Sequence, residues 1–122
     1  MNTERAADVE CEIRSQQKFS DLLQWLEMQK GGVATFYEFQ HRSLALRSQD
    51  GQHAGLLRLL ADLAGRFADL YDGEPLDLST ANQAVYSLTG YVREATQLKP
   101  GEAGELLELM NRIGLAELVP AD

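Results

Sequence analysis

The sequence predicts an all-α fold, a compact bundle of four or five short-to-medium helices that are mostly antiparallel. Apolar residues recur every three or four positions in several segments, which is the period of a helix that buries one face. Short glycine- and proline-containing breaks separate these segments, and short connections favour antiparallel neighbours. The four breaks divide the 122 residues into five segments: Gly31-Gly32, Asp50-Gly51, Asp72-Gly73-Glu74-Pro75 and Lys99-Pro100-Gly101.

The first thirty residues allow two interpretations. Two sets of apolar residues have helical spacing: Ala6, Val9 and Ile13, then Phe19, Leu22, Leu23 and Leu26. However, residues 9–13 also alternate between apolar and charged side chains, which is the period of a strand. A long or broken helix is favoured, and the alternative is a short strand that pairs with residues 35–39 or 43–47.

The second segment, residues 33–48, is also predicted to be a helix, because it contains few β-branched residues. On a helical projection, one broad apolar face carries Val33, Phe36, Tyr37 and Leu44. Phe39 and Leu46 lie off that face, so we expect this helix to present aromatic side chains in at least two directions.

The third segment has the clearest helical pattern. Its apolar residues are spaced by four, three, four and three positions: Leu56, Leu60, Leu63, Phe67 and Leu70. This spacing predicts one continuous buried face. Gly73 is expected to follow the end of the helix.

The fourth segment carries a second regular pattern, formed by Ala81, Val85, Leu88, Val92 and Ala95. Ser79 is expected to cap its first turn, and Pro100 to stop it. Gly90 weakens a helix relative to alanine, so its presence predicts that another helix passes close by.

The fifth segment follows Gly101. The buried face of the predicted helix carries Leu106, Leu109, Met110 and Ile113, and Gly114 is expected to end the helix. The apolar residues beyond it, Leu115, Leu118 and Val119, predict a last half-turn or a docking strip.

Length and composition indicate one helical domain, residues 1–122. The single cysteine, Cys11, allows no intramolecular disulfide and fits a reducing compartment. No signal peptide or membrane-spanning stretch is recognisable, so we expect a cytoplasmic protein without membrane contact.

Charge argues against nucleic acid as a partner. The net charge is −8, and eleven acidic and four basic residues lie in positions 62–122, where phosphate would be repelled. Arginine outnumbers lysine by eight to three, a bias typical of GC-rich bacterial genomes.

No motif for catalysis or for cofactor binding is present. Glu38 and His41 have the spacing of one half of a di-iron motif, but the second copy is missing. His53 stands on another segment, and Cys11 lacks a local base to activate it. We therefore expect no enzyme, no catalytic residue, no cofactor and no metal.

The remaining functional signal is aromatic. Trp25, Phe36, Tyr37 and Phe39 are too many for one buried face, and large aromatic residues often anchor protein contacts. They predict a protein interface, including a homodimer, although all four could instead pack inside.

By elimination, the expected function is that of a non-catalytic bacterial regulator (adaptor, anti-activator or inhibitor). Its alternatives are a cytoplasmic chaperone for a secreted substrate and an acidic inhibitor that mimics nucleic acid.

Overall fold

The computed structural model describes residues 17–30, 32–99 and 101–118, and it confirms the all-helical bundle. A first helix covers residues 17–27. The helices that follow are α2 (Val33–Arg47), α3 (Ala54–Leu70), α4 (Leu78–Thr96) and α5 (Ala103–Leu115), and a 3₁₀ turn, η1 (Gly51–His53), leads into α3. The described part of the chain contains no strand.

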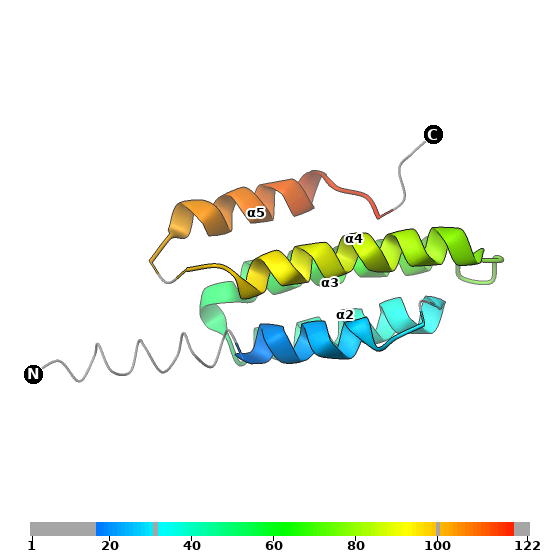
Figure 1. Ribbon diagram of the computed structural model, residues 1–122, viewed down its shortest axis with the longest axis horizontal. Helices are drawn as coiled ribbons and strands as arrows, with labels where there is room; N and C mark the ends of the chain where they lie inside the picture. The colour runs from blue at the N-terminus through cyan, green and yellow to red at the C-terminus, as the bar shows by residue number, and fades with distance from the viewer. Residues whose placement is uncertain (1–16, 31, 100, 119–122) are drawn as a thin grey trace, which may run out of the picture.

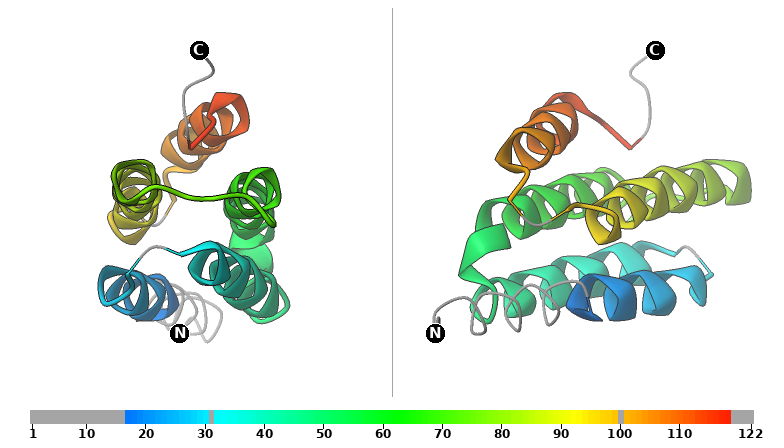
Figure 2. Two further views of the ribbon diagram at one scale, coloured as in Figure 1. Left: turned by 90° about the vertical axis from the view of Figure 1, so that its right-hand side faces the viewer. Right: turned by 60° about the vertical axis from the view of Figure 1, so that its left-hand side comes forward.

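The helices form three layers (Figures 1 and 2). The first helix lies beside α2, α4 lies beside α3 in the next layer, and α5 covers the outer side of α3 and α4. Each helix runs opposite to the one before it along the chain, as the short connections predicted (Figure 1).

Helix α3 lies at the centre of the core, and its predicted buried face is confirmed over most of its length. Leu56, Leu60, Leu63 and Phe67 are at most 2% exposed. Leu70 is the exception, because it is 66% exposed. As the last residue of α3, it lies beyond the end of the packed face.

The face predicted for α2 is right only in part. Its buried residues are Phe36, Phe39 and Ser43, and Leu46 packs against the same core. Val33 and Tyr37 lie at the edge of this core, and Leu44 is not part of it. A buried serine, Ser43, takes one position of this face, so the apolar residues alone did not show its full extent.

Two expectations for α4 are also wrong. Asp77, not Ser79, caps the helix, since its carboxylate accepts a hydrogen bond from the Thr80 backbone N–H at 3.2 Å. A Cβ added to Gly90 would meet nothing within 4 Å, so no described element passes close to it. The close approach occurs at Gly65 of α3, against the Gln40 side chain.

The turn glycines and the C-terminal tail follow the predictions in part. Gly73 adopts a left-handed φ of 77° after the end of α3, as expected of a glycine in that turn. Helix α5 continues past Gly114 to Leu115, which is 89% exposed. Leu118 is 3% exposed and docks on the core, whereas Val119 lies outside the described residues.

The strand alternative loses both proposed partners, because residues 35–39 and 43–47 belong to α2. Cys11 and the alternating residues 9–13 lie outside the described residues. None of the described helices combines the length and apolar character needed to cross a bilayer.

Candidate protein-binding surface

Two of the four predicted interface anchors lie inside the protein. Phe36 and Phe39 are both 0% exposed. The Phe36 ring meets Phe67 of α3 edge-on, with 4.5 Å between the ring centroids. Both side chains therefore belong to the core of this chain, which is the alternative that the sequence left open for them.

The other two anchors are half-buried at the edge of the core. The Arg42 guanidinium lies 4.4 Å from the centroid of the Trp25 ring and covers one of its faces. Arg42 is itself paired with Glu38 at 3.1 Å. On the opposite flank of α2, the Tyr37 hydroxyl donates a 2.8 Å hydrogen bond to Asp69.

The described residues contain no group of three metal-ligating side chains. Glu38 and His41, the two halves of the candidate motif, are both exposed, and Glu38 is engaged by Arg42. These two residues therefore have the character of solvated surface residues.

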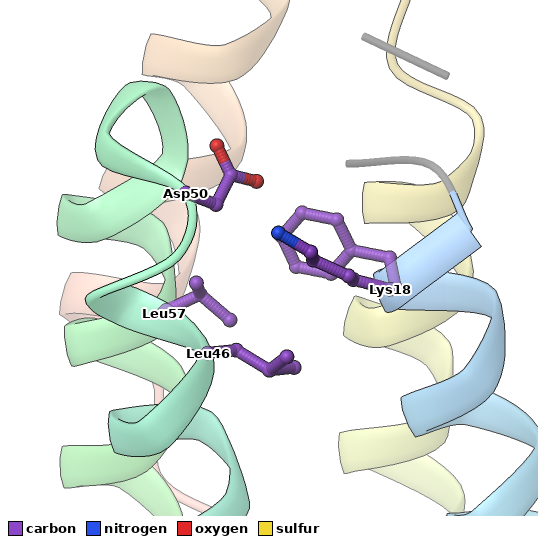
Figure 3. Close-up of a pocket in the computed structure, with 5 residues that line it drawn as sticks. Lys18, Leu46, Asp50 and Leu57 are labelled. Atoms are coloured by element: carbon purple, nitrogen blue, oxygen red, sulfur yellow. The ribbon is translucent and has the colours of Figure 1, made fainter. Parts of the chain in front are cut away.

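The most polar buried cluster surrounds Asp50 (Figure 3). The side chain of Asp50 is 2% exposed, and its Oδ2 lies 2.9 Å from Nδ1 of His53. Its Oδ1 has no hydrogen-bond partner among the described residues. Lys18 extends from the first helix toward this turn and donates a 3.0 Å hydrogen bond to the Gln49 carbonyl.

An Asp–His pair can orient a general base, but catalysis also needs space for a substrate. The gap at this cluster is lined by Lys18, Phe19, Leu46, Asp50 and Leu57, and it does not admit a water molecule. The Phe19 ring also meets the His53 ring edge-on at 5.5 Å. The cluster therefore fastens the α2–α3 corner to the first helix, and its geometry is that of a structural contact.

Three exposed apolar residues belong to segments at the opposite end of the bundle, where the first helix and α3 end and α4 begins (Figures 1 and 2). Met28, Leu70 and Leu78 are 77%, 66% and 72% exposed. Four carboxylates lie between the last turn of α3 and the start of α4: Asp69, Asp72, Glu74 and Asp77. We call these seven residues the end surface.

The end surface differs from the rest of the exterior in its charge balance. Residues 69–78 contain four acidic residues and no basic residue. Elsewhere, five arginines on the exterior are paired with carboxylates, in the pairs Arg42–Glu38, Arg58–Asp62, Arg66–Glu117, Arg93–Glu27 and Arg112–Glu94. The four carboxylates of the end surface form no ion pair with a described residue, so they leave a local excess of negative charge.

The ionisation of Tyr37 reflects this charge. Its pKa is raised to about 12, first because the hydroxyl donates to Asp69, then because of desolvation and the negative charges of Asp69 and Asp72. A tyrosinate at this position would lose that hydrogen bond and face carboxylates of the same charge.

The Tyr37–Asp69 contact predicts a pH dependence. Because the pKa is higher in the folded state than the ordinary value of 10.0, the contact stabilises the fold below pH 10 and loses this effect as the pH rises toward 12. We expect Tyr37→Phe to be less stable than the parent below pH 10, with the difference shrinking between pH 10 and 12. Denaturant midpoints measured from pH 8 to 12 check this; a difference that stays constant over this range contradicts it.

The sequence did contain a signal for the end surface. From Asp69 to Leu78, acidic and apolar residues are interleaved, and this pattern is readable without a structure. The excess of acidic residues in this half of the chain was used only as an argument against a nucleic-acid partner. The signal became interpretable only when Leu70 and Leu78 proved to be exposed.

No protein-family model matches the chain, and no significant similarity to a curated protein or to a solved structure was found.

Proposed function

We propose that this protein is a non-catalytic bacterial regulator of the adaptor, anti-activator or inhibitor type, which acts by binding another protein through its end surface. The observation that supports this most directly is the combination of three well-exposed apolar side chains with four carboxylates that lack an ion-pair partner among the described residues. Large exposed apolar residues at one end of a small domain are candidates for a contact surface.

The composition of the surface defines the chemistry of the partner. Four carboxylates attract a segment rich in lysine or arginine and speed its encounter. Met28, Leu70 and Leu78 then require apolar side chains opposite them, and methionine adapts well to partners of different shape. The partner surface is therefore basic and apolar together, as on one face of a basic amphipathic helix.

The apolar side chains favour this function over mimicry of nucleic acid, because a mimic needs charge but gains nothing from exposed leucines. A chaperone for a secreted substrate would use the same kind of surface on an unfolded segment. The single cysteine fits the reducing cytoplasm, where we place the activity.

The test is affinity capture from a bacterial lysate with three forms of the protein. Leu70→Ser/Leu78→Ser removes two anchors of the end surface, and we expect it to lose at least one protein that the parent retains. Leu107→Ser is the matched control, because Leu107 is also a leucine, is 59% exposed and lies on α5. We expect this control to capture the same proteins as the parent.

The salt response identifies the type of contact. Binding to the end surface should weaken as salt rises from about 0.05 to about 0.5 M, since the carboxylates become screened. Displacement of the captured protein by DNA or RNA would indicate a mimic, and capture of unfolded segments alone would indicate a chaperone. Identical capture by the parent and by Leu70→Ser/Leu78→Ser would refute a role for the end surface.

A further inference from the structure

Helix α4 presents to solvent a face on which Arg93 carries the one charge. The fifteen residues from 78 to 92 contain no charged side chain, in a chain of which 25% of residues are charged. Six outward positions follow the helical spacing of four and three: Ser79, Gln83, Tyr86, Gly90, Arg93 and Gln97. We call this row the α4 ridge.

Two residues at the centre of the ridge lie outside the core that the described residues form. Tyr86 is 80% exposed, the largest aromatic exposure among the described residues. Gly90, one turn further along, costs helix stability and has nothing within 4 Å of the position of a Cβ. A bulky aromatic side chain thus lies beside an open depression on the same helix.

The ridge is self-complementary when a second copy lies against it in the antiparallel direction. In an antiparallel two-fold pair centred near position 88, a residue before position 88 in one copy faces the residue equally far beyond position 88 in the other copy. Tyr86 then faces Gly90 of the second copy, and Gln83 faces Arg93. The large side chain meets the position without a side chain, and the amide oxygen meets a guanidinium donor.

We propose that the protein self-associates through the α4 ridge, with a second copy of this chain as its occupant in an antiparallel, two-fold arrangement. Two-fold pairing uses the same patch on both copies, as this complementarity requires. This interface is separate from the end surface and does not depend on the proposed regulatory function.

The distribution of charge explains why two copies would meet through α4. Two copies with a net charge of −8 each repel, so their contact is favoured where a surface carries the least charge. The charged residues at the end of the ridge are already paired with neighbouring helices. Arg93 bonds to Glu27 at 3.4 Å, and Glu94 bonds to Arg112 at 2.8 Å.

The size of the ridge sets the expected strength. A helix of 19 residues is about 28 Å long, and one helix pair buries less than the ~800 Å² per partner of a standard interface. We therefore expect a weak, concentration-dependent dimer, visible by sedimentation velocity between about 10 µM and about 1 mM.

The first experiment replaces Gly90 with glutamine. The new side chain meets no described neighbour in its own chain and favours the helix, so the fold and its thermal stability should be preserved or improved. In the dimer it occupies the place of the second copy's Tyr86, and we expect the dissociation constant to rise at least ~10-fold. Gly104→Gln is the matched control, because Gly104 of α5 is equally open, and it should leave dimerisation unchanged.

The second experiment tests the direction of pairing by disulfide trapping in a Cys11→Ser background. Gln83→Cys/Arg93→Cys should give a covalent dimer on oxidation, and Gln83→Cys alone should not. The two positions are about 15 Å apart along one helix, too far for a disulfide within a chain. A parent that remains monomeric at about 1 mM, an unchanged dimer in Gly90→Gln, or trapping by Gln83→Cys alone would each overturn the proposal.

Discussion

Replacing Phe36 with alanine is expected to lower the free energy of unfolding by about 3–5 kcal/mol. The Phe36 ring is 0% exposed and packs edge-on against Phe67, so its removal leaves a cavity between α2 and α3. The cavity lies where these two helices pack along each other, and the surrounding side chains can fill it only in part. Denaturant unfolding followed by far-UV circular dichroism measures the change.

Tyr86→Ala is the matched control for this prediction. It also removes an aromatic ring from a helix, but this ring is 80% exposed, so the expected change is within about 0.5 kcal/mol. If Phe36→Ala were as stable as the parent, Phe36 could not be a core residue. It would then be available as an interface anchor, as its place among four clustered aromatic residues predicted.

Replacing His53 with alanine is expected to cost about 1–3 kcal/mol. The side chain of Asp50 is 2% exposed, and Nδ1 of His53 is the only hydrogen-bond partner of its carboxylate among the described residues. Without the imidazole, the carboxylate remains buried with neither oxygen satisfied. The substitution also removes the edge-on contact with Phe19 that fastens the first helix to the α2–α3 corner.

Two further variants separate the hydrogen bond from a general effect of losing a histidine. His41→Ala removes an exposed histidine and should change stability by less than about 0.5 kcal/mol. The double variant Asp50→Ala/His53→Ala should be more stable than the sum of the two single changes predicts, because it leaves no unsatisfied partner. Strictly additive effects would show that the two side chains do not interact.

The local sequence alone determined the division into helices and the buried face of α3. The breaks at Gly51 and Gly73 lie between α-helices in the structure, because glycine allows backbone conformations that end a helix. Leu56, Leu60, Leu63 and Phe67 were identifiable as core, since a helix that packs on several sides needs a regular apolar row. These properties depend on residues within one or two turns of each other.

Only the tertiary structure decided which face of α2 is buried and what the aromatic residues do. Ser43 lies in the core and Leu70 lies outside it, and both oppose the expectation from their residue type. Phe36 and Phe39 are both buried because α3 covers one side of α2 along its length, which the sequence of α2 cannot reveal.

The two proposed binding surfaces depend on the tertiary structure in the same way. Met28 is about forty positions from Leu70 in the sequence, yet the first helix, which Met28 follows, and α3, which Leu70 ends, finish on the same side of the bundle (Figure 1). Gly90 was expected to face a helix of the same chain, and no described neighbour covers it. Periodicity shows that a helix has a face, but whether that face meets the core, solvent or another molecule depends on which helices pack against it.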